Sequence, residues 1–449
     1  MNFSELGLSQ PVLQALDLKG YDTPTPIQAQ AIPTVLDGRD LLGIAQTGTG
    51  KTAAFMLPAI DLMAASGKHP QRRQCRMLVL APTRELASQI ATSARDYSRF
   101  ARLKTAVVFG GTSVGKNRRD LAHGVDILVA TPGRLVDLVE QKALDLSRVE
   151  ILVLDEADQM LDLGFIHALR KIVGWLPRQR QTLLFSATMP KPIRELANQY
   201  LVDPAQVSVA PAATTAERVE QYVFFVNQSE KQALLGYVLK KGFDAGEIDR
   251  VLVFTRTKHG ADKVVRKLAQ ANIPASAIHG NKSQPQREKA LGQFRQGKIR
   301  VLVATDIAAR GIDIPGVSHV INFELPNVSE QYVHRIGRTG RAGAAGMAIA
   351  FCAADERAYL RDIQKLTRVT LGKIPLPQGF REVVDSVEEH SRVQPQRRPK
   401  PKAKVTPAGQ HQHRNRPRRS ASEQPKDGQR KRRRRSRGGS RSASGGQRG

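Results

Sequence analysis

The chain has 449 residues, 40% of them hydrophobic, and carries 70 Lys and Arg against 41 Asp and Glu, a formal net charge of +29. This length suits two domains and a tail, and the charge favours a polyanionic partner, either nucleic acid or an anionic membrane surface. Only Cys75 and Cys352 are present, which excludes a disulfide framework and a cysteine zinc site. With no signal-peptide pattern and no apolar run of about 18 residues, we expect a soluble cytoplasmic protein that does not associate with a membrane.

The positive charge is concentrated at the C-terminus. Residues 391–449 hold 20 Lys and Arg and 2 Asp and Glu, a net charge of +18, which leaves +11 for residues 1–390. This segment is rich in Pro, Gln, Ser and Gly and has almost no large apolar residue, so it cannot offset the entropy cost of ordering. We expect a disordered basic tail, which either tethers RNA without sequence preference or only keeps the protein soluble.

Short apolar runs recur along the rest of the chain and predict an α/β fold. They include MLVLAPT, VDILVATP, VEILVLDEAD and QTLLFSAT in the first half, and YVFFV, VLVFT, VLVATD and VINF in the second. Such continuous runs are typical of strands covered on both faces, as in a parallel sheet, and amphipathic stretches of helical length separate them. We predict a first domain over 1–205, a linker over 206–217, a second domain over 218–378 and the tail over 379–449.

A glycine-rich segment in the first half predicts a phosphate-binding loop. It follows the strand-like run LLGI, precedes a helical run, and consists of Ala45, Gln46, Thr47, Gly48, Thr49, Gly50, Lys51 and Thr52. Glycines allow backbone N–H groups to surround phosphates at a helix N-terminus. Lys51 supplies a positive charge to the outer phosphates and the Thr52 hydroxyl can ligate Mg²⁺. The general pattern begins with Gly, where this chain has Ala45.

A pair of carboxylates follows the apolar run ILVL. Because parallel strands deliver ligand-binding residues at their carboxyl ends, Asp155 and Glu156 are expected at the same sheet edge as the phosphate loop. Asp155 would hold Mg²⁺ through water, and Glu156 would orient and deprotonate the attacking water. A solvated acidic turn is the alternative, and it is less compatible with such an apolar strand beside a phosphate loop.

These segments, with Asp155-Glu156-Ala157-Asp158 in the middle, resemble those of DEAD-box ATP-dependent RNA helicases, and most closely the bacterial RhlE-type group. The resemblance covers roughly residues 2–375. It implies two tandem RecA-like domains with mostly parallel sheets, and an enzyme that hydrolyses ATP with Mg²⁺ to unwind or remodel RNA duplexes and RNA–protein complexes locally. Ribosomal precursors or the mRNA decay machinery are compatible partners. A role in cold adaptation is also compatible with the resemblance.

The resemblance also assigns roles within the ATPase. Gln28, in the segment GYDTPTPIQ, would read the adenine edge, and Phe3 would stack on the ring. Asp158, Ser186, Thr188 and His334 would couple hydrolysis to strand separation. Arg338 and Arg341, in HRIGRTGR, would reach the γ-phosphate from the second domain, and Asp313 would hold the ATP ribose.

Loops after the predicted strands of both domains carry hydroxyls, arginines and glycines, which suit contacts to phosphates. The resemblance places one RNA strand on these loops, bound through phosphate and ribose without base specificity. The residues implied are Thr83, Arg84, Gly111, Thr131 and Arg134 in the first domain, and Arg256, Gly280, Gln284, Arg287, Thr305 and Arg310 in the second.

Two other functions remain open at this point. The first is a non-enzymatic RNA-binding protein with an inactive nucleotide pocket, against which the intact Lys51, Asp155 and Glu156 argue. The second is a DNA-directed translocase of related architecture. The physiological RNA and the oligomeric state are not defined by the sequence.

Overall fold

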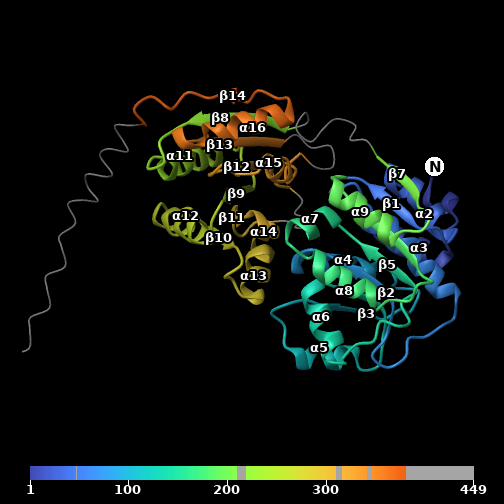
Figure 1. The fold of residues 1–449 in the computed structure, drawn as a ribbon. Coiled ribbons are helices and arrows are strands. Elements are labelled where there is room, and N and C mark those ends of the chain that lie inside the picture. The colour runs from blue at the N-terminus through green and yellow to red at the C-terminus, as the bar shows by residue number, and fades with distance from the viewer. Residues whose placement is uncertain (47, 210–218, 310–315, 341–345, 381–449) are drawn as a thin grey trace, which may run out of the picture. The chain divides into compact units, whose positions relative to one another are not determined.

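The structure is a computed structural model that describes residues 1–46, 48–209, 219–309, 316–340 and 346–380. Within these ranges the chain forms two lobes, each built on a seven-stranded sheet with helices on both faces (Figure 1). All strand pairs in both sheets are parallel. The expected α/β class with parallel sheets is therefore confirmed.

The first lobe contains the elements of residues 3–208. They are η1 (Phe3–Leu6), α1 (Gln10–Asp17), α2 (Pro26–Leu36), β1 (Leu41–Ile44), α3 (Lys51–Ala65), β2 (Cys75–Leu80), α4 (Arg84–Tyr97), β3 (Thr105–Val108), α5 (Val114–Leu121), β4 (Val125–Ala130), α6 (Pro132–Glu140), β5 (Ile151–Leu154), α7 (Ala157–Asp162), α8 (Ile166–Gly174), β6 (Gln181–Ser186), α9 (Lys191–Tyr200) and β7 (Ala205–Ser208).

The second lobe contains the elements of residues 219–373. They are β8 (Val219–Phe225), α11 (Lys231–Asp244), β9 (Val251–Thr255), α12 (Lys258–Gln270), β10 (Ala275–Ile278), α13 (Gln284–Arg295), β11 (Val301–Thr305), α14 (Asp306–Ala309), β12 (His319–Asn322), α15 (Ser329–Ile336), β13 (Gly346–Cys352), η2 (Ala354–Glu356), α16 (Arg357–Thr367) and β14 (Gly372–Lys373).

The two sheets have the same topology. The first has the strand order β3-β4-β2-β5-β6-β1-β7 and the second β10-β11-β9-β12-β13-β8-β14. Counted from its own first strand, each sheet runs third, fourth, second, fifth, sixth, first, seventh. Equivalent loops of the two lobes therefore follow equivalent strands.

Alternating side chains of the strands fill the cores on the two faces of each sheet. In β2, Met77 and Val79 pack with the helices α2, α3 and α4, while Leu78 and Leu80 face α6, α8 and α9. In the second lobe, the residues of β9 divide between two cores in the same way. This burial on both faces explains why the strands are continuous apolar runs rather than alternating ones.

The limits of the sheets differ in detail from the expected domain limits. Ala205–Ser208 forms β7 and pairs with β1, so residues 206–208, expected in the linker, belong to the first sheet. Residues 210–217 of that linker lie outside the described residues. Phe380, expected in the tail, packs into the core of the second lobe, and residues 381–449 are not described.

Both cysteines are buried free thiols, as expected for two small apolar side chains. Burial raises the pKa of the Cys75 thiol to about 12 and that of Cys352 to about 11, so neither forms a thiolate at neutral pH. Among the described residues, no helix combines the length and the apolar character that crossing a bilayer requires.

Arg76, at the amino end of β2, connects several segments of the first lobe. Its buried guanidinium donates to Glu150, to the Ser66 hydroxyl and to the carbonyl oxygen of Met63, and lies 3.7 Å from a carboxylate oxygen of Asp126. Because the Asp126 side chain is also buried, this arginine balances a carboxylate that has little contact with water.

Replacing this arginine is expected to destabilise the lobe strongly. Arg76→Ala leaves Asp126 buried without its cation, and we expect a loss of about 3–5 kcal/mol in the free energy of unfolding. Urea unfolding followed by circular dichroism measures it. Arg148→Ala, which removes an exposed arginine from the same lobe, is the control and should change stability by less than about 0.5 kcal/mol. Equal stability of the two variants would contradict the role given to Arg76.

Candidate functional site

The phosphate loop connects β1 to α3, and its backbone requires glycine. Gly48 and Gly50 have φ of 86° and 92°, in the left-handed region that other residues avoid. Gly50 is the residue before the first turn of α3, so the free N–H groups of that turn point towards the loop. Thr49 donates from its hydroxyl to the carbonyl oxygen of Gln46, which closes the loop. Thr47 lies outside the described residues.

Gln28 contacts this loop directly. Its side-chain nitrogen donates to the Gly50 carbonyl oxygen at 3.2 Å, and its side-chain oxygen accepts from the Thr25 backbone N–H at 2.8 Å. A Cβ at position 50 would lie 2.4 Å from the Gln28 side-chain nitrogen, so any larger residue here would displace the Gln28 amide. Phe3 is buried and lines the same pocket. The loop and the segment expected to bind adenine are thus one packed unit.

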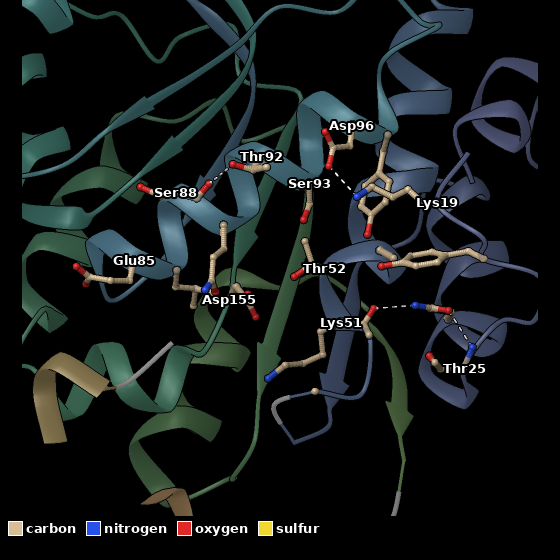
Figure 2. Close-up of a pocket in the computed structure, with 18 of the residues that line it drawn as sticks. Lys19, Thr25, Lys51, Thr52, Glu85, Ser88, Thr92, Ser93, Asp96 and Asp155 are labelled. Carbon is tan, nitrogen blue, oxygen red and sulfur yellow. Dashed lines mark hydrogen bonds and ion pairs between the residues drawn. The ribbon is translucent and has the colours of Figure 1, made fainter. Parts of the chain in front are cut away.

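Three charged residues of the pocket each have a buried polar atom that makes no hydrogen bond within the described residues. Figure 2 shows Lys51 from the start of α3 and Asp155 from the end of β5 at the same pocket, which Glu156 also lines. Within the part of the chain that the structure describes, Lys51 Nζ, one oxygen of Asp155 and one oxygen of Glu156 make no hydrogen bond. Burial, against the opposing effect of Lys51, raises the pKa of Asp155 to about 7.

Such groups are costly to bury, so their presence points to a ligand that would pair with them. Lys51 and the N-terminus of α3 fit phosphate oxygens. The described residues contain no group of three or more His, Cys, Asp or Glu that could form a cage for a metal ion. One carboxylate and the Thr52 hydroxyl, completed by water and phosphate, fit Mg²⁺ because that ion usually keeps several waters.

Glu156 has an unusual backbone conformation. Its φ of 54° and ψ of 54° lie in the left-handed region, although the residue is not glycine. It precedes α7, and its carbonyl oxygen accepts from Met160 N–H. Conformations of this kind cost energy and are concentrated at functional sites. The bend turns the chain sharply between Asp155, at the strand end, and Asp158, in the helix.

Asp158 joins this helix to the loop after β6. One of its carboxylate oxygens accepts from the backbone N–H groups of Ala187 and Thr188 and from the Thr188 hydroxyl, at 2.9–3.2 Å. Ser186 donates from its hydroxyl to the Thr188 carbonyl oxygen at 2.7 Å. The structure therefore brings together three of the four residues expected to couple hydrolysis to strand separation. His334, the fourth, lies in α15 of the second lobe.

The candidate RNA-binding residues of the first lobe follow β2, β3 and β4, which are neighbours in the sheet. Thr83 caps α4 by accepting from Leu86 N–H. Arg84 lies against the glycine pair after β3, since a Cβ at Gly111 would be 2.5 Å from its guanidinium. Arg134 donates to the carbonyl oxygen of Thr112, in the same loop. Thr131, the residue before α6, is buried.

In the second lobe, the corresponding residues follow β9, β10 and β11, again neighbours in the sheet. Arg256 is held by Glu324, which accepts from its backbone N–H, and by Glu356, 3.6 Å from its guanidinium. A Cβ at Gly280 would meet no atom within 4 Å, so the backbone there can be approached closely.

Helix α13 and strand β11 carry the other candidates of this lobe. Gln284 and Arg287 lie in the first turn of α13, where Gln284 donates to Glu288 and Arg287 donates to the His279 carbonyl oxygen. Thr305 ends β11 opposite Thr255.

The expected arginine fingers are described only in part. Arg338 follows α15 and donates to the His334 carbonyl oxygen at 3.2 Å. Arg310, Asp313 and Arg341 lie outside the described residues.

One wall of the pocket consists of residues that the motifs in the sequence do not include. Figure 2 shows Ser88, Thr92 and Asp96 of α4 around it, with Lys19 paired to Asp96 at 2.7 Å. The signal was present in the sequence, because these three polar residues recur every four positions and so share one face of an amphipathic helix. Tyr21 lines the pocket as well and belongs to the segment expected to bind adenine.

Two family models match the chain. The model for DEAD/DEAH box helicases matches residues 25–196, and the model for the helicase conserved C-terminal domain matches residues 230–343. The ATP-dependent RNA helicase DBP2 of Ajellomyces capsulatus is 45% identical over 80% of this chain and 67% of its own length. The chain belongs to the DEAD/DEAH box helicase family.

A further curated relative and a solved structure support this family assignment. The DEAD-box ATP-dependent RNA helicase 30 of Arabidopsis thaliana is 43% identical over 81% of this chain and 61% of its own length. The chain thus spans about two thirds of the length of these curated relatives. Among solved structures, S. cerevisiae Dbp5 bound to RNA and ADP BeF3 is 30% identical with a TM-score of 0.74, over 86% of this chain and 99% of that one. This similarity confirms the two RecA-like lobes.

The contact between Gln28 and the loop gives a test of the pocket. In Gly50→Ala, the added methyl group would collide with Gln28 at a left-handed backbone position, so we expect ATP binding to weaken at least tenfold, equivalent to about 1.4 kcal/mol. Anisotropy of a fluorescent ATP analogue measures it. Gly174→Ala, at the open end of α8, is the control and should bind ATP like the parent chain. Unchanged binding by Gly50→Ala would contradict this site.

Proposed function

We propose that this DEAD-box family member is an ATP-dependent RNA helicase that hydrolyses ATP to unwind RNA duplexes and remodel RNA–protein complexes locally. The observation that carries the proposal is the pocket at the carboxyl ends of β1 and β5, where Lys51, Asp155 and Glu156 each have a buried polar atom without a hydrogen bond among the described residues, beside a glycine loop. The relatives named ATP-dependent RNA helicases and the solved Dbp5 complex with RNA and ADP BeF3 support it.

In this proposal each lobe contributes part of the ATPase. Lys51 and the α3 N-terminus bind the phosphates, Gln28 and Phe3 bind adenine, and Asp313 of the second lobe binds the ribose. Glu156 orients a water molecule and accepts its proton as it attacks the γ-phosphate. Mg²⁺, held by Thr52 and through water by Asp155, would neutralise charge on the phosphates. Arg338 and Arg341 supply planar guanidinium groups to the oxygens of the transferred phosphoryl group.

The RNA strand, in this proposal, lies along the carboxyl ends of β2, β3 and β4 and of β9, β10 and β11. The groups offered there are guanidinium groups, hydroxyls and exposed glycine backbone, which suit phosphate and ribose. A track of this kind reads no base sequence. Asp158 transmits the state of the phosphate pocket to the Ser186–Thr188 loop, because it bonds that loop while lying two residues from Glu156.

Assignment to the bacterial RhlE-type group, action on ribosomal precursors or in mRNA decay, and a cytoplasmic location remain predictions from sequence resemblance. Crosslinking to cellular RNA followed by sequencing would identify the RNA.

Hydrolysis tests the enzymatic proposal. We expect ATPase activity that RNA stimulates and DNA does not, and a decrease of at least about 10²-fold in Glu156→Gln, because the general base is lost. Glu195→Gln, which removes an exposed carboxylate on α9, should leave the rate unchanged. Stimulation by DNA alone would favour the DNA translocase, and absence of hydrolysis with either polymer would favour a non-enzymatic RNA-binding protein.

The contacts of Asp158 test coupling. Asp158→Ala removes the acceptor of three hydrogen bonds, so we expect unwinding of a short RNA duplex to decrease at least about tenfold while RNA-stimulated hydrolysis decreases less than about threefold. A strand-displacement assay with parallel phosphate release measures both. Asp162→Ala, at the exposed end of the same helix, is the control. Parallel loss of both activities would argue against coupling through Asp158.

A further inference from the structure

A second positively charged surface lies on the first lobe, at the amino ends of its strands. Four cations, Arg72, Arg73, Arg118 and Lys142, line a hollow of about 370 Å³ together with Ala122, Gln141 and Ala143. We call these seven residues the basic hollow. Arg72 and Arg73 precede β2, Arg118 is on α5, and Lys142 follows α6. None of the candidate ATP or RNA residues contributes to its lining.

The hollow is formed by specific contacts between these segments. Arg73 donates from its guanidinium to the Lys142 carbonyl oxygen at 3.2 Å, and Arg118 donates to the Gln141 side-chain oxygen at 3.1 Å. Gly124, with a φ of 78°, allows the segment before β2 to approach the turn after α5, since a Cβ there would lie 2.1 Å from the Gln71 carbonyl oxygen. Four cations are thus held close together although they repel one another.

Two of the four cations also have strained backbones. Arg73 has a φ of 59° and Lys142 a φ of 53°, in the region that favours glycine. Lys142 ends the turn after α6, where its N–H and that of Ala143 donate to the Val139 and Leu138 carbonyl oxygens, and glycine is the usual residue at such a position. Glycine adopts this conformation without strain, so both positions tolerate a substitution that removes the charge and keeps the backbone.

The lining identifies the chemistry of the partner. Its charged members are all cations, and two or more guanidinium groups suit the oxygens of phosphates. Its neutral members are two alanines and a glutamine, so it offers no aromatic surface on which a base could stack and no apolar groove for a peptide. These properties fit a phosphate backbone bound without sequence preference.

We propose that the basic hollow is a second RNA-binding surface, which contacts the phosphates of RNA that extends beyond the track at the carboxyl ends of the strands. The inference rests on the proposed function in one respect, that the polymer bound is RNA. The six residues of β2 span roughly 20 Å. The hollow lies at the amino ends of the strands and the track at their carboxyl ends, so this distance separates them. Only an RNA longer than the track occupies both, which makes the hollow selective for structured or flanking RNA.

The backbone strain provides variants that remove charge without unfolding the lobe. In Arg73→Gly combined with Lys142→Gly, glycine relieves two left-handed conformations, so the thermal midpoint should not fall. The matched control combines Arg102→Gly and Arg368→Gly, which also removes two exposed cations at positive φ, 56° at each, outside the hollow. The two double variants have the same net charge.

Binding of full-length chains to two RNAs tests the proposal. We expect the Arg73/Lys142 variant to bind a long RNA hairpin with a single-stranded extension roughly tenfold more weakly than the control variant at moderate salt. The slope of log K against log salt concentration should be shallower by about 1.5 for this variant, as expected when two phosphate contacts are lost. Both variants should bind a short single strand, and be stimulated by it in ATP hydrolysis, like the parent chain. In the parent chain, the long RNA should protect Lys142 from an amine-modifying reagent and the short strand should not.

The possible outcomes separate this inference from the proposed function. Equal binding of the hairpin by the two double variants, or modification of Lys142 unaffected by the hairpin, overturns the basic hollow as an RNA surface and leaves the helicase intact. If the Arg73/Lys142 variant binds both RNAs more weakly and the control variant does not, the inference is also overturned, because the substitutions would then have affected the track. Protection of Lys142 by an acidic peptide but not by RNA would assign the surface to a protein partner. A parent chain that binds neither RNA contradicts both proposals.

Discussion

Parallel strands deliver all their following loops to one edge of a sheet, and this constraint organises both lobes. In the first lobe the edge divides into two halves along the strand order. β1, β5 and β6 carry the phosphate loop, the carboxylate pair and the Ser186–Thr188 loop, whereas β2, β3 and β4 carry the arginine and glycine loops. β2 and β5 are neighbours, so the two halves meet at the centre of the sheet. The proposed nucleotide site and the proposed RNA track are thus adjacent without sharing a strand.

Buried charged groups distinguish the half of this edge that β1, β5 and β6 form. Lys51, Asp155 and Glu156 each retain an unpaired polar atom among the described residues, and burial raises the pKa of Asp155. A ligand that carries phosphate and a cation would pair with all three groups at once, and its binding would stabilise the folded lobe. Asp158 contrasts with them, because its carboxylate accepts hydrogen bonds from Gln159, Ala187 and Thr188. Within four consecutive residues, the chain has one carboxylate bonded to the Ser186–Thr188 loop and two that each keep one oxygen without a hydrogen bond among the described residues.

Much of this was predictable from sequence, for identifiable reasons. Strands buried on both faces are continuous apolar runs, so the strands can be recognised in the sequence. The residues directly after each run can then be placed at the carboxyl edge of the sheet, where the phosphate loop and the carboxylate pair lie. The contact of Gln28 with Gly50, the left-handed φ of Glu156 and the grouping of Arg73, Arg118 and Lys142 were not predictable. Each depends on a backbone conformation or on the packing of segments far apart in the chain. Similarly, the sequence predicts a linker from residue 206 because the strand Ala205–Ser208 has no continuous apolar run, and only its pairing with β1 shows that it belongs to the sheet.

The burial of both thiols has a practical consequence. Cys75 and Cys352 have negligible exposure and raised pKa values, so maleimide dyes have no reactive native target in the folded, described part of the chain. A cysteine introduced on the surface of each lobe would therefore be labelled selectively in an otherwise unaltered protein. Energy transfer between two such dyes would measure whether the distance between the lobes changes when ATP and RNA are added, without a cysteine-free background and the core substitutions that it requires.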